Sequence, residues 1–236
     1  MRRTLIAGLL SIGGLAASAQ ASSLDIAYQG VFGKGTYHVQ LDGSTQHVHA
    51  GRMTYQVTGG SHGSFTPGSS FHAFCVELEQ LVNGGSKSYE IHTESFADSG
   101  LGIEDLGPTM PRSRTEALSA LFLRHFEAAV TGSRREASAF QLATWEIIYE
   151  DGGSWDVGAG DFLVTSGDAD ARAGAQALLD DIAGLEQLGD VSDLLVGFGS
   201  GQFQDQLTLI PLPAPVMMGL AGLAGAMVAR RRLRRG

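Results

Sequence analysis

Residues 133–149 read SRREASAFQLATWEIIY, and this pattern predicts a helix with one side turned to a core. Ser133 and Glu136 have the spacing of a capping box, in which each side chain bonds the backbone N–H of the other residue. Gln141 lies one helical turn before Trp145 and therefore on the same apolar face. Because a buried carboxamide costs free energy unless it is hydrogen-bonded, we expect Gln141 to meet polar partners inside the protein.

Residues 71–78 read FHAFCVEL and predict a strand. Alternation puts Cys75 on one face with Ala73, and Phe74 on the opposite face with Val76. Both faces are largely apolar, so another element must cover the side of the cysteine. The helix described above is the natural candidate for that cover.

The rest of the pattern predicts an α+β fold for a globular domain at residues 22–210. We expect a β-sandwich or barrel-like sheet with an inserted helical subdomain of about three helices, at about residues 113–185, plus a C-terminal transmembrane helix. Ser113 and Glu116 suggest a second capping box, at the start of the first helix. The expected strands are Tyr28–Phe32, Thr36–Leu41, Met53–Val57, Phe71–Leu78, Ser88–Glu94 and Phe203–Ile210, and the expected helices are 113–130, 133–149 and 169–185.

The first 21 residues have the three parts of a signal peptide. A basic start is followed by an apolar run over residues 5–17 and by the A-x-A pattern of Ala19 and Ala21. We therefore expect export by the general secretory route and removal of residues 1–21 by signal peptidase. A buried N-terminal helix is the alternative.

The C-terminal residues 211–236 combine a proline motif, an apolar stretch and an arginine cluster. Residues 212–229 are 18 in number and would span roughly 27 Å as a helix, close to the ~30 Å of a bilayer core. Arginines after such a span stay in the cytoplasm, which would leave the globular domain outside. The motif residues are Pro211, Leu212, Pro213 and Ala214, and the membrane-stop residues are Arg230, Arg231 and Arg232.

This tail resembles the PEP-CTERM class of sorting signals, in particular its VPLPA variant, with Ile210 in the place of the usual valine. The resemblance implies transient anchoring in the inner membrane and cleavage near the proline motif by an exosortase-type processing protease. A plain tail anchor is the alternative. The expected localisation is the cell surface or the extracellular space.

The expected mature domain is strongly acidic. The whole chain has 16 Lys and Arg against 25 Asp and Glu, a net charge of −9. Seven of the arginines lie in the two end segments, so residues 22–210 keep 9 basic against 25 acidic residues, a net charge of −16. Such a surface repels phosphate backbones and argues against a nucleic-acid partner.

Cys75 is the only cysteine, so an exported chain has no intrachain disulfide partner for it. One reaction explains both the unpaired thiol and the inward-facing glutamine. The Cys75 sulfur attacks the side-chain carbonyl of Gln141, ammonia leaves, and an internal thioester joins the two residues. Such a bond is an acyl donor that captures an amine covalently. The alternative is that Cys75 and Gln141 only pack in the core.

The sequences CVE at residues 75–77 and QLATW at residues 141–145 resemble the two motifs of the thioester domains of bacterial surface proteins, the TQXA class. In that class a strand with Cys-x-[Asp/Glu] precedes a helix with Gln-x-Ala-x-Trp. Two departures are visible: Phe140 stands in the place of the threonine of the class name, and Glu77 in the place of the commoner aspartate.

The resemblance implies a thioester between Cys75 and Gln141, with Glu77 and Trp145 as supporting residues. It also implies a surface or extracellular-matrix protein that adheres covalently to amine-bearing ligands. The alternative is a non-covalent structural or adhesion module of an exopolysaccharide matrix.

Two further groups of polar residues are weaker candidates for a metal site. Histidines two apart on a strand face are more typical of an exposed strand than of a zinc site. The acidic residues of a Gly-rich loop lack the spacing of an EF-hand, and a solvated loop is expected. No nucleophile–base pair or phosphate-binding loop is apparent, so we expect no enzymatic activity, no cofactor and no metal. The residues concerned are His38, His47 and His49, and Asp151, Asp156 and Asp161.

Overall fold

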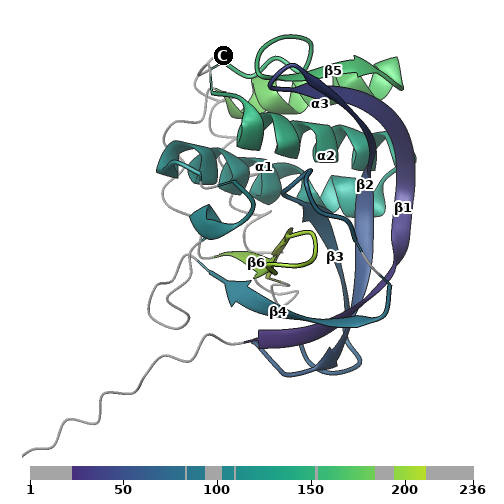
Figure 1. Cartoon of the computed structure of the whole chain (residues 1–236), viewed down its shortest axis with the longest axis vertical. Coiled ribbons are helices and arrows are strands. Elements are labelled where there is room, and N and C mark those ends of the chain that lie inside the picture. Colours follow the sequence, from purple (N-terminus) through teal and green to yellow (C-terminus); the bar gives the residue numbers. More distant parts are fainter. Residues whose placement is uncertain are drawn as a thin grey trace, which may run out of the picture.

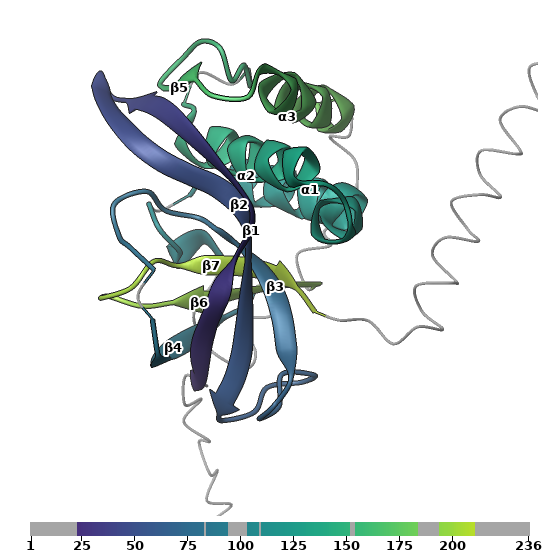
Figure 2. The same cartoon turned by 90° about the vertical axis from the view of Figure 1, so that its right-hand side faces the viewer.

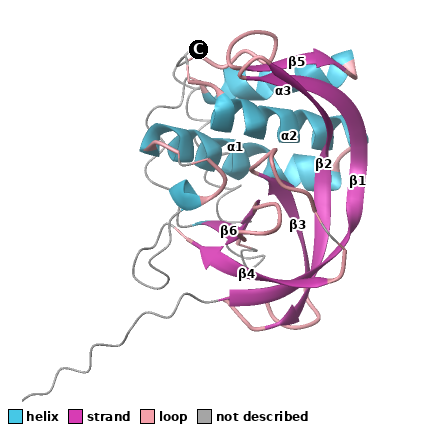
Figure 3. Ribbon diagram, in the orientation of Figure 1, coloured by secondary structure: helices cyan, strands magenta, loops and turns pink. Residues whose placement is uncertain are grey.

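The computed structural model describes residues 23–82, 84–93, 103–108, 110–151, 154–183 and 194–210. Its elements combine a sheet with a layer of helices, as Figures 1 and 3 show. The α+β class predicted from the sequence is confirmed. In chain order the elements are β1 (Ser23–Leu41), β2 (Ser44–Gly59), β3 (Ser70–Cys75), β4 (Ser86–His92), η1 (Ile103–Asp105), α1 (Arg112–Thr131), α2 (Arg134–Tyr149), β5 (Phe162–Ser166), α3 (Ala169–Ile182), β6 (Leu195–Gly199) and β7 (Gln206–Leu209).

The strands form one antiparallel sheet in the order β2-β3-β7-β6-β4-β1-β5, with a further pairing between β2 and β1. This extra pairing closes six of the strands into a ring, because β1 bonds β2 along most of its length and β4 at its start. β5 pairs with the far end of β1, outside the ring. A cluster of buried rings from β2, β3, β6 and the β2–β3 loop fills the core beside these strands: Tyr55, Phe65, Phe71 and Phe198.

β1 and β2 make a long hairpin that extends beyond the ring. Its turn, Asp42-Gly43, has positive φ at both residues (49° and 77°), as a two-residue hairpin turn requires. Irregular register near Gly30 and Gly35 interrupts the ladder between the two strands. Figure 2 shows the outer half of the hairpin rising past the helices while β3 stays in the lower part of the molecule.

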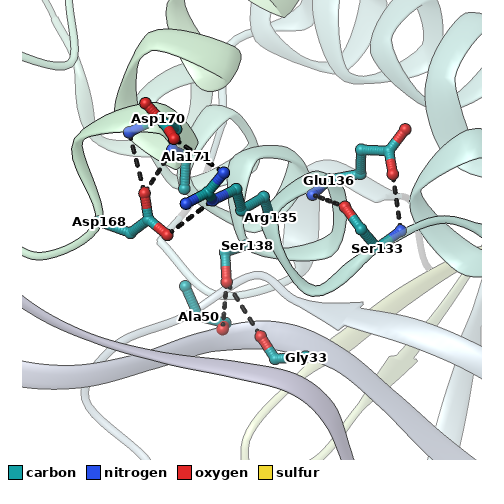
Figure 4. Close-up of polar contacts among 9 residues, drawn as sticks. All are labelled: Gly33, Ala50, Ser133, Arg135, Glu136, Ser138, Asp168, Asp170 and Ala171. Atoms are coloured by element: carbon teal, nitrogen blue, oxygen red, sulfur yellow. Dashed lines mark hydrogen bonds and ion pairs between the residues drawn. The ribbon is translucent and has the colours of Figure 1, made fainter.

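Helix α2 lies between α1 and α3 and packs against the β1–β2 hairpin, and all its residues from 137 to 148 are buried. It begins with the predicted capping box: Ser133 N–H donates to Glu136 Oε2 at 2.6 Å, and Glu136 N–H to Ser133 Oγ at 3.4 Å. The buried Ser138 hydroxyl lies 3.0 Å from the carbonyl oxygens of both Gly33 and Ala50, which ties the helix to the β1–β2 hairpin (Figure 4).

The start of α3 is fixed to the same helix. The Asp168 carboxylate caps α3 by accepting the N–H groups of Asp170 and Ala171. Arg135 of α2 pairs with Asp168 at 3.1 Å and with Asp170 at 2.8 Å (Figure 4). These exposed ion pairs contribute little stability by themselves but set the position of α3.

Several sequence predictions need correction. The two strands predicted at Tyr28–Phe32 and Thr36–Leu41 are one continuous strand, and the predicted strand Phe71–Leu78 ends at Cys75. The capping box predicted at Ser113 is wrong, because α1 begins after Pro111, whose fixed φ suits a helix start without a side-chain cap. β5 and β6 were not predicted.

The predicted signal peptide, residues 1–21, and the predicted sorting tail, residues 211–236 with its transmembrane helix, lie outside the described residues. None of the helices in the described part of the chain is long and apolar enough to cross a bilayer.

The contact between α2 and the hairpin predicts a difference between two glycines of β1–β2. Gly33 has φ +71° and a Cβ there would lie 3.0 Å from Arg134 Cα, whereas Gly43 has φ +77° and open space around it. Both Gly→Ala changes cost about 1–2 kcal/mol of left-handed strain, and Gly33→Ala adds about 1–3 kcal/mol of overpacking. Chemical denaturation should therefore show the larger loss for Gly33→Ala; equal losses would contradict the close approach of α2.

Candidate functional site

Cys75 is the last residue of β3. On its β7 side it pairs with Gln206, but on the side that faces β2 it has no strand partner. The next residue, Val76, donates its N–H to Asp205 O at 3.1 Å on the β7 side. Since backbone groups of successive strand residues point to opposite edges, the N–H and C=O of Cys75 point to the β2 side. There the last pair that joins β2 to β3 is Met53 with Ala73.

The side chain of Gln141 on α2 fills this gap. Cys75 N–H donates to Gln141 Oε1 at 3.0 Å, and Gln141 Nε2 donates to Cys75 O at 2.8 Å. Both residues are almost fully buried, with 2% and 1% of their surface exposed. The carboxamide therefore takes the place of the peptide group of a neighbouring strand, and the structure brings the two residues together.

The thiol of Cys75 lies in an apolar environment with two polar neighbours. Its Sγ donates to the backbone O of Glu77 at 2.8 Å. Burial raises the pKa of the Cys75 thiol well above its ordinary value, so the group is protonated at neutral pH. The indole N–H of Trp145 lies beside the sulfur and opposes this rise in the pKa, although it makes no hydrogen bond of regular geometry among the described atoms.

Glu77, the acidic residue of the CVE motif, anchors the chain after β3 to the start of β7. Its Oε1 accepts the N–H of Asp205 at 3.0 Å. The Asp205 carboxylate in turn accepts the N–H groups of Gly107 at 2.9 Å and Ser200 at 2.7 Å. Burial and then the negative charge of Asp205 raise the pKa of the Glu77 carboxyl to about 7.

A cavity of about 270 Å³ leads from the surface to the sulfur. Its floor includes Cys75, Trp145 and Met53, which are buried, and its wall includes Leu78, Gln80, Leu81 and Val82. Gln141 does not line it. A small molecule in this cavity would therefore meet the sulfur first and the carboxamide only behind it.

Three residues of the site were not predicted. The Tyr149 hydroxyl accepts the N–H of Leu78 at 2.9 Å, and Gln204 Nε2 donates to Glu77 O at 2.8 Å. Tyr149 lies two turns after Gln141 on the same helix face, so helical periodicity could have found it. Gln204 and Asp205 reach the site through the pairing of β3 with β7, for which the sequence carries no local signal.

The other predicted polar groups do not contact Cys75 or Gln141, although His47 and His49 line the same cavity. The rings of His38 and His47 are 5.0 Å apart and those of His47 and His49 are 5.7 Å apart, on one face of the β1–β2 hairpin. Asp151 pairs with Arg114 of α1. Within the part of the chain that the structure describes, no group of three or more His, Cys, Asp or Glu residues is arranged to hold a metal ion.

The acidic side chains near the end of α2 hold the loop that follows it. Glu146 is fully buried; its Oε1 accepts the N–H of Asp156 at 2.7 Å, and its Oε2 has no hydrogen-bond partner among the described atoms. Glu150 Oε2 accepts the N–H of Asp161 at 2.7 Å. Burial raises the pKa of the Glu146 carboxyl to about 8, and the nearby charges of Glu150 and Asp156 add to the rise.

Comparisons of the chain with protein-family models, with curated proteins and with solved structures found no match. The resemblances to the TQXA class and to the PEP-CTERM class therefore rest on the motifs of this sequence.

The buried carboxyl groups predict a stability that falls with rising pH. The folded-state pKa values of Glu146 and Glu77 exceed the ordinary 4.5, so the folded protein holds these protons more tightly than the unfolded chain. This contribution is complete below about pH 4.5 and is lost as the pH rises through 7 to 8. The free energy of unfolding, measured with urea, should fall by about 2–4 kcal/mol from about pH 5 to about pH 9.

Glu146→Gln keeps an acceptor for Asp156 N–H and cannot ionise. It should therefore reduce the fall in the free energy of unfolding as the pH rises through about 8. Glu90→Gln, at an exposed position of β4, is the matched control and should leave the profile unchanged. A Glu146→Gln profile as steep as that of the parent protein would show that Glu146 is already ionised in the fold.

Proposed function

We propose that this chain is an exported surface or extracellular-matrix protein whose domain forms an internal thioester between Cys75 and Gln141 and uses it for covalent attachment to amine-bearing ligands. The observation that supports this most is the pair of hydrogen bonds, 3.0 and 2.8 Å, between the Gln141 carboxamide and the backbone of Cys75. These bonds hold the buried carboxamide against the backbone of the residue that carries the thiol, and such positioning favours the reaction.

In the proposed reaction the Cys75 sulfur attacks Cδ of Gln141. A C–S bond forms, the C–N bond breaks, and the thiol proton leaves with the amide nitrogen as ammonia. Cys75 N–H already bonds Oε1, where negative charge develops in the tetrahedral intermediate, so it acts as an oxyanion donor. The Trp145 N–H beside the sulfur favours the thiolate that attacks.

The surroundings support protection of the bond from water. Phe140, in the place of the threonine of the TQXA class, is fully buried and its ring lies 4.4 Å from that of Phe74. Phe122 and Phe126 of α1 pack on the same two rings. The departure at residue 140 thus adds an apolar side chain to the core on the face of β3 that carries Phe74, opposite to the side chain of Cys75.

The proposed export and anchoring rest on the two end segments. Signal peptidase would remove residues 1–21, and an exosortase-type protease would process the tail at the motif that begins with Pro211, after transient insertion of residues 212–229 in the inner membrane. The acidic domain would then lie at the cell surface or in the extracellular matrix.

A second candidate is a non-covalent structural or adhesion module of an exopolysaccharide matrix, with Cys75 and Gln141 as packing residues. Two observations favour it. The carboxamide already has a partner for its oxygen and one for its nitrogen, as a structural side chain would. The raised pKa of the Cys75 thiol also slows attack at neutral pH, because only the thiolate is a good nucleophile.

Intact mass spectrometry of the exported protein separates the two candidates. The thioester predicts a mass lower by one ammonia than the sequence between the mapped ends, and a Cys75 that iodoacetamide does not alkylate under native conditions. Methylamine should open the thioester. The mass should then rise by that of one methylamine, and the Cys75 thiol should become free.

Two variants control this measurement. Cys75→Ala should recover the full sequence mass, which excludes loss of ammonia at another residue, and Gln141→Glu should leave Cys75 free to alkylate after unfolding. A parent protein of full sequence mass, with Cys75 alkylated once it is unfolded, would refute the thioester and leave the structural module.

A further inference from the structure

The cavity that reaches Cys75 has basic side chains at its rim and no carboxylate in its wall. Lys34, His47 and His49 are exposed and line it. None of the described residues that form its lining is Asp or Glu. This is unexpected in a domain where residues 22–210 carry a net charge of −16, since a surface with so many acidic residues should place some of them at an opening of this size.

The charges at the rim act on one another. The pKa of His49 is lowered by burial and then by the positive charges of Lys34 and His47. Lys34 is the only Lys or Arg among the described lining residues, and its positive charge at the opening attracts an anion and repels a cation.

The floor of the cavity carries the buried indole N–H of Trp145, which lies beside the Cys75 sulfur. Trp145 has 2% of its surface exposed, lines the cavity, and its Nε1 has no hydrogen-bond acceptor among the described atoms. Apolar side chains, among them Tyr28, Val48 and Met53, complete the walls. The volume of about 270 Å³ equals roughly nine water molecules at ~30 Å³ each, enough for a short-chain molecule.

We propose that the acyl acceptor of this site is a primary amine that carries a carboxylate a few bonds from its nitrogen. The carboxylate lies at the basic rim near Lys34, and the short apolar part of the molecule brings the amine to the floor. This inference rests on the proposed thioester and names the class of amine that opens it.

The transfer step is balanced without a cofactor. The unprotonated amine nitrogen attacks Cδ of Gln141, an amide C–N bond forms and the C–S bond breaks. The sulfur of Cys75 leaves as a thiolate and takes up the proton that the amine loses. The Trp145 N–H is next to the sulfur on which this negative charge appears.

A matched pair of amines tests the inference. The exported full-length protein is incubated with 4-aminobutanoate or with 4-aminobutanamide, which differ in charge and little in shape, at equal concentrations of unprotonated amine. Intact mass spectrometry follows the adduct on Gln141. The carboxylate should react about 3- to 10-fold faster, and added salt should reduce the difference.

Lys34→Gln should remove most of the preference, and Lys34→Glu should reverse it. Lys87→Gln is the control, because it removes the same charge from β4, where Lys87 lies over the Phe203 ring and outside the cavity lining. Each variant is first shown to lack one ammonia, which establishes that it folds and forms the bond.

The outcomes are distinct. A protein that lacks one ammonia but adds both amines equally, or whose preference survives in Lys34→Glu, overturns the assignment of the acceptor and leaves the thioester intact. A protein of full sequence mass overturns the thioester, and the acceptor with it.

Discussion

The structure depends on the end of β3, where Cys75 no longer has β2 as a neighbour. Where β2 turns away from β3 to rise beside the helices, the peptide groups of Cys75 would be buried without partners, at about 1–3 kcal/mol each. The carboxamide of Gln141 satisfies both. This contact joins the helical layer to the ring of strands, and it also holds the electrophilic carbon of Gln141 next to the backbone of the residue that carries the thiol. Stability and the proposed chemistry therefore share the same two hydrogen bonds.

The sequence predicted the parts of this arrangement whose causes are local. The capping box at Ser133, the inward face with Gln141 and the strand before Cys75 follow from spacing and periodicity. β6, which reads LVGFG, is too short and too rich in glycine to show a strand pattern, and its place depends on pairing with β4 and β7. Asp205 is likewise brought to Glu77 by strand pairing across 128 residues of sequence. Non-local pairing leaves no periodic signal.

The burial of Cys75 has opposite effects on the formation of the proposed thioester and on its survival. It raises the pKa of the Cys75 thiol, which slows the attack that forms the bond. It also keeps water from the carbonyl carbon once the bond exists, because Cys75 and Gln141 are both almost fully buried. The cavity reaches the sulfur and not the glutamine, so it admits a nucleophile from one side only. An environment of this kind favours a bond that forms slowly and persists until a ligand enters.

The hydrogen bonds also differ between the states of the proposed cycle. The free carboxamide donates from Nε2 to Cys75 O. A thioester has no N–H, so in that state the buried carbonyl of Cys75 loses its donor, at a cost of about 1–3 kcal/mol. Aminolysis produces an N-substituted amide, whose trans form turns its one N–H to the side opposite the carbonyl oxygen. That amide can accept from Cys75 N–H but cannot also donate to Cys75 O in the way that the free carboxamide does. The strand edge at Cys75 therefore destabilises the thioester relative to the free carboxamide from which it forms, by the loss of the donor to Cys75 O.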